Sequence, residues 1–130
     1  MVRPDRIQMI DNTIGQEEVI DPDAVERLRR LGGVVLINRM IDLFAGHAGP
    51  IIERAQKDLQ EGNFDGVHRA GHSLKSSAAN VGATQMGRTA AEIERLALAG
   101  DGPVLEKLIA ELRSAFDLAK AKLGEIRSQH

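Results

Sequence analysis

The chain lacks cysteine, tryptophan and tyrosine, and it has only three phenylalanines among its 130 residues. Without cysteine it can form no disulfide and has no thiolate chemistry. With so few aromatic side chains, platforms on which nucleic-acid bases stack are not expected. The core must therefore be built from aliphatic side chains, which pack readily between helices.

An excess of charge of one sign is also missing. Lys and Arg number 17 against 19 Asp and Glu, which leaves a formal net charge of −2. No basic field that would hold nucleic acid through its phosphates is evident. Residues 1–15 contain no apolar stretch of the signal-peptide type, and no apolar run approaches the length of a membrane span. We therefore expect a cytoplasmic protein that binds neither nucleic acid nor membrane.

The length of the chain fits a single domain. A content of 42% hydrophobic and 28% charged residues is ordinary for a globular protein and argues against disorder. Residues 1–20 mix charged and apolar residues without a firm period, so we interpret them as an irregular N-terminal arm. Residues 21–127 are predicted to form the folded domain.

Apolar residues recur at gaps of three and four along most of this domain, which is the pattern of amphipathic helices. No segment shows the sustained alternation of a strand. Four long helices joined by short turns favour an all-α fold, an antiparallel up-and-down four-helix bundle with a short extra N-terminal helix. The predicted helices, the short one first, span residues 22–31, 34–61, 64–81, 84–99 and 104–126.

Several helix ends can be read from single residues. The short helix should start at the capping residue Asp21 with Pro22 in its first turn, and stop at Gly32-Gly33. Thr84 is expected to cap a later helix. Pro50 falls inside the first long helix, where proline removes a hydrogen bond and clashes with the preceding turn. The sequence leaves open whether that helix kinks or breaks at Pro50.

The helix predicted over residues 64–81 carries the candidate reactive group. At 100° per residue, His72 points roughly 130° away from the centre of the apolar stripe, and Lys75 follows about one turn later. His72 should therefore be exposed, although an exposed histidine alone is more often a bystander than a reactive group. Little side-chain bulk would keep a second protein from its imidazole. The small residues around it are Gly71, Ser73, Ser76, Ser77, Ala78 and Ala79.

An exposed histidine of this kind is suited to nucleophilic chemistry. An unperturbed imidazole has a pKa of about 6.5, so the neutral ring is well populated near neutral pH. The lone pair of one ring nitrogen can then attack phosphorus, and a hydrogen bond to the other nitrogen would fix the tautomer. The compact ammonium group of Lys75 can balance charge on phosphoryl oxygens.

The segment HSLKSSAANVGA, residues 72–83, resembles the signature of histidine-containing phosphotransfer (HPt) domains of bacterial multistep phosphorelays. That pattern is a histidine, any residue, leucine, lysine, a small residue and later a glycine. One departure is Ser76, where the family often has glycine, and its hydroxyl could alter the choice of partner. The resemblance covers about residues 20–123. Similar features recur at Ile20-Asp21-Pro22, Leu43-Phe44, Glu61-Gly62-Asn63-Phe64 and Ile93-Glu94.

The resemblance implies a phosphoryl carrier rather than an enzyme. Such domains accept a phosphoryl group on the histidine, here His72, from an aspartate of a receiver domain and pass it to another receiver. The receiver supplies Mg²⁺ and most catalytic groups, so no cofactor or metal is expected in this chain. Lys75 would be the charge partner of the phosphoryl group. Glu94 lies where family members often place a Glu or Gln that hydrogen-bonds the imidazole.

The resemblance also implies partners, namely response-regulator receiver domains and a hybrid sensor histidine kinase. Arg69 shares the exposed helix face with His72 and would contact an acidic receiver rim. Ser76 and Ala79 are the other residues expected to contact a partner. Carriers of this kind are monomers as a rule, and we expect the same here.

Two alternatives remain. The same bundle could be a non-phosphorylated docking module that binds a signalling partner through the face around His72. Alternatively, His68 and His72, four residues apart, could bind a metal ion with Asp65 as a third ligand. No further ligand is obvious outside this helix, so His68 is more simply a boundary residue at a solvated helix edge. His47 and His130 have no motif around them and are interpreted as surface residues.

Overall fold

The structure is a computed structural model that describes residues 18–128. Within that range there is no strand, and the prediction of an all-α fold is confirmed. Residues 1–17, most of the predicted N-terminal arm, lie outside the described residues. The elements are α2 (Pro22–Gln60), α3 (Phe64–Val81), α4 (Thr84–Leu96), the 3₁₀ helix η1 (Ala97–Ala99) and α5 (Gly102–Ser128).

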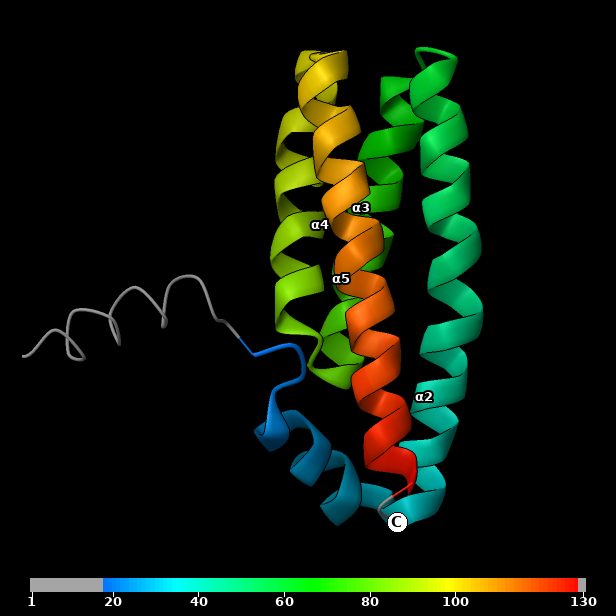
Figure 1. The fold of residues 1–130 in the computed structure, drawn as a ribbon, viewed down its shortest axis with the longest axis vertical. Coiled ribbons are helices and arrows are strands. Elements are labelled where there is room, and N and C mark those ends of the chain that lie inside the picture. Colours follow the sequence, from blue (N-terminus) through cyan, green and yellow to red (C-terminus); the bar gives the residue numbers. More distant parts are fainter. Residues whose placement is uncertain (1–17, 129–130) are drawn as a thin grey trace, which may run out of the picture.

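The long helices form an antiparallel bundle in which the chain runs alternately up and down (Figure 1). Helix α3 packs against α2 and α4, and α5 packs against the same two helices. Helices α3 and α5 therefore occupy diagonally opposite corners of the bundle, and the four-helix bundle predicted from the sequence is confirmed. A residue on the outer side of α3 lies on the face of the molecule opposite α5.

The short N-terminal helix is the first part of α2. Its cap is Asp21, whose side chain accepts a hydrogen bond from the backbone N–H of Asp23 at 3.0 Å, and Pro22 occupies the first turn. The backbone leaves the helical region at Gly33, with φ 66° and ψ −159°. Glycine adopts such angles without steric cost. The predicted stop is therefore correct, and the chain re-enters a helix directly after this bend.

Pro50 does not break α2. The helix continues through it to Gln60, and its non-helical backbone angles are at Gly33 rather than at Pro50. A proline within a helix costs about 3 kcal/mol of intrinsic propensity. Pro50 itself is exposed, but Ala48 and Ile52 on either side of it are fully buried. Tertiary packing of the apolar face thus outweighs local propensity, as it does for most helices in proteins.

Two other helix ends differ from the sequence-based expectation. Thr84 is not a cap, because the capping position is Ala83 and the Thr84 hydroxyl donates to the main-chain oxygen of Glu18. The hydroxyl therefore ties the segment before α2 to the start of α4. The α-helical part of α4 ends at Leu96, and a 3₁₀ turn completes the segment that was predicted as one helix.

The core is aliphatic, as the composition requires. Its aromatic members are Phe44 and Phe116, which meet edge to face with 5.4 Å between ring centroids. The largest fully buried side chains come from all four long helices and are Phe116, Ile37, Ile52, Leu74, Met86, Ile93, Leu105, Leu112, Leu123, Val67 and Val81.

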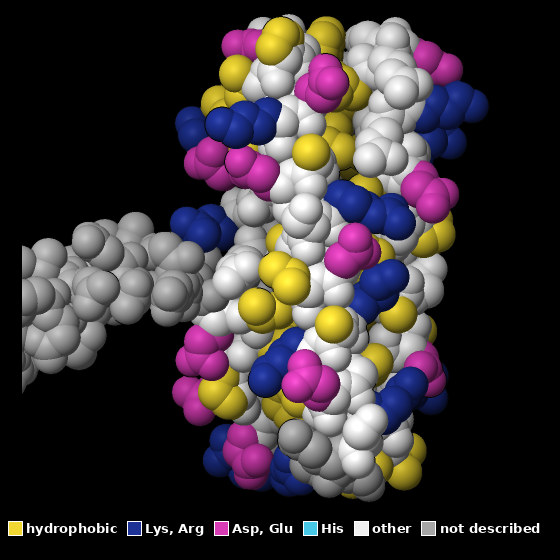
Figure 2. All heavy atoms as spheres, in the orientation of Figure 1, with side chains coloured by type: hydrophobic (Ala, Val, Ile, Leu, Met, Phe, Trp, Pro, Cys, Tyr) yellow, Lys and Arg dark blue, Asp and Glu magenta, His cyan; other side chains and the backbone are white. Residues whose placement is uncertain are grey.

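The surface carries mixed charge. On the face shown in Figure 2, acidic and basic side chains alternate with small apolar patches, and neither sign dominates. No helix among residues 18–128 combines the length and the apolar character needed to cross a bilayer.

Candidate functional site

His72 lies in the middle of α3, on the side of the helix that faces solvent. Its side chain is 67% exposed, whereas Val67 and Leu74 on the opposite side of α3 are fully buried. The helix is anchored at both ends. The Asn63 side chain caps its start, and Gly82, in the left-handed region with φ 73°, ends it as the sequence predicts. The fold thus presents the His72 imidazole from a rigid support.

Glu94 reaches from α4 to this histidine. Its Oε2 atom lies 2.5 Å from Nδ1 of His72, and its Oε1 atom accepts a hydrogen bond from Nζ of Lys75 at 2.6 Å. The Glu94 side chain is 19% exposed, and that of Lys75 is 44% exposed. One carboxylate therefore bridges the two α3 residues that the sequence singles out.

The protonation of this group follows from its contacts. The hydrogen bond from the Lys75 ammonium lowers the pKa of the Glu94 carboxyl, and the hydrogen bond from His72 lowers it further. Desolvation acts in the other direction, but the net shift of the pKa is downward. Glu94 is thus a carboxylate at neutral pH, and a carboxylate only accepts hydrogen bonds. Nδ1 of His72 must therefore carry a proton, which leaves the lone pair of the neutral ring on Nε2.

Gly71 makes the close approach of α3 and α4 possible. A Cβ atom at this position would lie 2.7 Å from the backbone nitrogen of Glu94 and 3.0 Å from the carbonyl oxygen of Ala90. In the sequence, Gly71 stands out only as one of the small residues around His72, and its role in the packing of α3 against α4 is not apparent. The available signal was a glycine in a helix interior, which costs about 0.5–1 kcal/mol relative to alanine and so calls for a packing reason.

From the sequence, His68 is interpreted as a boundary residue at a helix edge, and the structure adds a contact that was not predicted. His68 is half-buried, and its Nδ1 atom lies 2.8 Å from the main-chain oxygen of Glu94, so the ring is engaged with α4. Asp65, the third residue of the metal hypothesis, forms an ion pair with Arg69 instead. Among residues 18–128 no group of three or more His, Cys, Asp or Glu side chains is placed to hold a metal ion.

The residues expected to contact a partner are all exposed on α3. Arg69 is paired with Asp65, and both side chains are 66% exposed. The Ser76 hydroxyl donates to the main-chain oxygen of His72 at 3.4 Å, so it is turned back onto its own helix. Ala79 presents only a methyl group. The side chains of Ser76 and Ala79 therefore project little from the helix, and they offer little steric obstruction to a partner that approaches His72.

An open pocket of about 570 Å³ lies directly over the site. It can admit a phosphoryl group together with the side chain that delivers it. Its lining residues are His68, Arg69, His72, Ser73 and Glu94.

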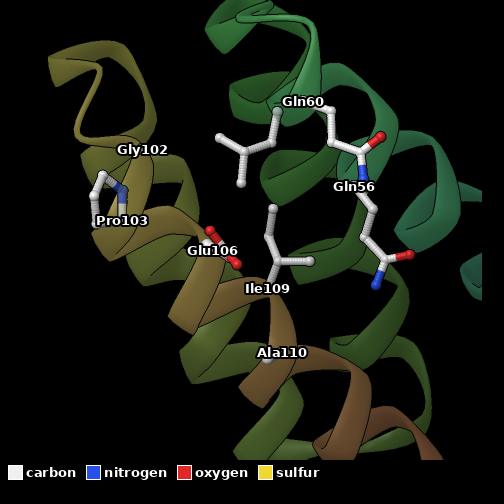
Figure 3. Close-up of a pocket in the computed structure, with 8 residues that line it drawn as sticks. Gln56, Gln60, Gly102, Pro103, Glu106, Ile109 and Ala110 are labelled. Atoms are coloured by element: carbon white, nitrogen blue, oxygen red, sulfur yellow. The ribbon is translucent and has the colours of Figure 1, made fainter.

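A pocket of about 650 Å³ elsewhere in the bundle has a different character. It lies between the end of α2 and the start of α5, with Gln56 and Gln60 on one side and Ile109 on the other (Figure 3). The ionisable residue in its lining is Glu106, and it shares no residue with the histidine site. Among the described residues, its lining contains no histidine and no cationic side chain beside Glu106, so the arrangement found around His72 is not repeated there.

The fold and the site together define a class: a helical bundle that exposes one imidazole nitrogen while a carboxylate from the next helix holds the other. The family model of the Hpt domain matches residues 39–122. The match covers most of the chain and includes His72, Lys75 and Glu94. The chain belongs to the Hpt family, the histidine phosphotransfer domains of phosphorelays, and the family resemblance of residues 72–83 is confirmed.

The fold has a clear relative of known structure. The crystal structure of histidine-containing phosphotransfer protein B (HptB) from Pseudomonas aeruginosa PAO1 superposes with a TM-score of 0.81, covering 88% of this chain and 98% of that chain. Sequence identity is 18%, so the similarity speaks to the fold. Comparison with curated protein sequences finds no match.

Proposed function

We propose that this protein accepts a phosphoryl group on Nε2 of His72 from the aspartate of a receiver domain and passes it to a second receiver. Family membership supports the general role of a phosphotransfer carrier. The observation that carries the assignment to His72 is its 2.5 Å contact from Nδ1 to Glu94, made by a side chain that is 67% exposed. That contact directs the lone pair of the neutral ring to Nε2.

The transfer step can be written with this geometry. The Nε2 lone pair of His72 attacks the phosphorus of the aspartyl phosphate, an N–P bond forms, and the electron pair of the broken P–O bond leaves with the aspartate carboxylate. The imidazole ring gains positive charge while its Nδ1 proton stays hydrogen-bonded to Glu94. A fixed carboxylate at this position stabilises that charge as it develops. The reverse reaction delivers the group to the next receiver.

Lys75 fits the role of charge partner for the transferred group. Its ammonium is held on Glu94 at 2.6 Å, on the oxygen that does not contact His72. The flexible four-carbon stem of lysine allows the ammonium to follow a new anion. We propose that Lys75 moves from Glu94 towards the phosphoryl oxygens once His72 is phosphorylated.

The partners in this proposal are response-regulator receiver domains and a hybrid sensor histidine kinase, with Mg²⁺ held by the receiver. Arg69, Ser76 and Ala79 form the proposed contact surface, because they are exposed beside His72. That the protein is a monomer and works in the cytoplasm also remains a prediction.

The proposal is tested by incubating the protein with receivers carrying labelled phosphate. Label should appear on this chain, be lost in acid and survive base, which is the behaviour of phosphohistidine. His72→Gln should abolish it without loss of helicity. The matched control is His47→Gln, since His47 is an exposed histidine on α2 outside the site, and it should label normally. Failure of every receiver to label the wild type, together with normal binding of a receiver to His72→Gln, would instead favour the docking module.

A further inference from the structure

His68 precedes His72 by about one helical turn on α3, and its ring turns towards α4. Nδ1 of His68 lies 2.8 Å from the main-chain oxygen of Glu94. A carbonyl oxygen can only accept, so Nδ1 of His68 must be the protonated nitrogen and must donate this hydrogen bond. The tautomer of His68 is therefore defined by the contact.

The accepting carbonyl is one that needs a partner. Glu94 lies in the last turn of α4, which ends at Leu96. The last four carbonyls of an α-helix lack regular partners within that helix. A donor from a neighbouring helix is a stable solution for such a group, because a carbonyl withdrawn from water without a hydrogen bond is costly. His68 thus fastens α3 to the end of α4 at the residue whose side chain contacts His72.

Glu94 is consequently held at both its main chain and its side chain. His68 contacts its carbonyl oxygen, while His72 and Lys75 contact its two carboxylate oxygens. The missing side chain of Gly71 lets the backbone nitrogen of Glu94 come close to α3. The side-chain contacts of Glu94 are partly exposed to water. The main-chain contact with His68 therefore fixes the backbone position from which the Glu94 side chain extends to His72.

We propose that His68 is a positioning residue for the phosphoacceptor: by fixing the main chain of Glu94, it keeps the carboxylate on Nδ1 of His72 and the lone pair on Nε2. In water a neutral imidazole favours the tautomer protonated at Nε2, which has no lone pair at the proposed nucleophile. Losing the hydrogen bond from His68 lets Glu94 withdraw, and the ring then returns towards that unreactive tautomer.

The first test reads the tautomer directly and needs no phosphotransfer. Ring ¹⁵N NMR on the isolated chain, above the pH at which imidazole is protonated, should report His72 protonated at Nδ1 in the wild type. In His68→Ala and His68→Phe, neither of which can donate to the Glu94 carbonyl, the His72 signals should shift towards the Nε2-protonated form. His68→Asn, whose amide N–H can donate to the same carbonyl, should restore much of the wild-type pattern.

The control is His47→Ala, which removes a histidine from α2 and should leave the His72 signals in place. Circular dichroism reports whether each variant folds, and if the alanine variant does not, the comparison of His68→Phe with His68→Asn decides. Identical His72 signals in the wild type and in the folded variants that lack a donor would overturn the proposal. A wild-type His72 protonated at Nε2 would overturn it equally.

The second test is the rate of phosphoryl uptake from a labelled receiver, and it rests on the proposed function. Loss of the hydrogen bond from His68 to the Glu94 main chain should slow uptake by about three- to tenfold in His68→Ala. The rate should recover in His68→Asn. A slower rate with an unchanged His72 tautomer would overturn positioning through Glu94. If the wild type takes up no phosphoryl group, the proposed function fails, while the NMR result still decides the role of His68.

Discussion

Asp58 in α2 and Glu94 in α4 are two carboxylates that both pack against α3. Asp58 accepts hydrogen bonds from Arg54 at 3.3 Å and from Asn63 at 3.4 Å, partners that lie four and five residues away in the chain. Glu94 contacts residues that precede it by 22, 19 and 26 positions, namely His72, Lys75 and His68. The first cluster is local in sequence, and the second exists only once α3 and α4 have packed.

Exposure separates the two clusters as well. The Asp58 side chain is 7% exposed, whereas that of Glu94 is 19% exposed and contacts a histidine that is 67% exposed. A buried carboxylate that contacts Arg54, one turn earlier in α2, and Asn63, the cap of α3, stabilises the connection between α2 and α3. A partly exposed carboxylate with distant partners contributes little to stability, because water screens it, but it sets the state of a surface group. The comparison predicts that stability and phosphotransfer depend on different acids.

The largest effects should come from replacing Glu94 or Asp58 with alanine in separate variants. Glu94→Ala removes the acceptor on Nδ1 of His72 and should slow phosphoryl uptake by about ten- to a hundredfold, by analogy with groups that orient histidine in other sites. Its thermal midpoint should change little. Asp58→Ala removes the acceptor shared by the Asn63 amide and the Arg54 guanidinium and leaves a gap where a buried side chain was, so it should lower the free energy of unfolding by about 1–2 kcal/mol.

Uptake rates measured with a labelled receiver and denaturant unfolding curves, recorded on both variants, make this test. Asp58→Ala should take up phosphoryl groups at close to the wild-type rate under conditions in which it is folded. Equal losses of rate in the two variants would contradict the separation of roles.

A smaller effect on phosphoryl uptake is expected from two helix glycines. Gly71→Ala places a methyl group against the backbone of Glu94 and Ala90, so α3 and α4 must separate. It should lower the free energy of unfolding by about 1–3 kcal/mol and slow uptake as well. In Gly87→Ala, the matched control in α4, the new Cβ meets Ala78 at an ordinary 3.6 Å. That variant should be more stable by about 0.5–1 kcal/mol, with uptake unchanged. Stabilisation by both substitutions would show that the close approach of α3 and α4 does not require a glycine at position 71.

The same division explains what could be predicted from the sequence. Helix periods, the Asp21 cap and the glycine stops at Gly33 and Gly82 depend on neighbouring residues, so they could be read from the chain. The exposure of His72 followed from the angle it makes with the apolar stripe. Glu94 was placed near His72 only through the family resemblance, because the contact depends on the register of α4 against α3.

The failures have the same origin. Thr84 has the residue type of a cap, but its hydroxyl is used by a main-chain oxygen 66 residues earlier in the chain. His68 was interpreted as a boundary residue at a helix edge, but its contact with the main-chain oxygen of Glu94 was not predicted, because that contact depends on the packing of α4. Pro50 has the local chemistry of a helix break, but buried neighbours on both sides hold the helix. In each case a tertiary contact outweighs a local preference.

The smallest expected effect is the change in stability that accompanies the titration of Glu94. Its pKa is lowered in the folded protein, first by the hydrogen bond from Lys75 and then by that from His72. The stability that comes with this shift is fully present above the ordinary glutamate pKa of about 4.3. It declines as the pH falls below that value and is gone below the lowered pKa.

Carboxyl ¹³C NMR across this acidic range should place the Glu94 midpoint below that of a free glutamate. Lys75→Met should move the midpoint upward by more than His72→Gln does, because the lysine hydrogen bond is the larger cause. The stability change itself should be slight, since water screens the group. A larger upward shift in His72→Gln than in Lys75→Met would mean that the histidine, rather than the lysine, is the main cause of the lowered Glu94 pKa.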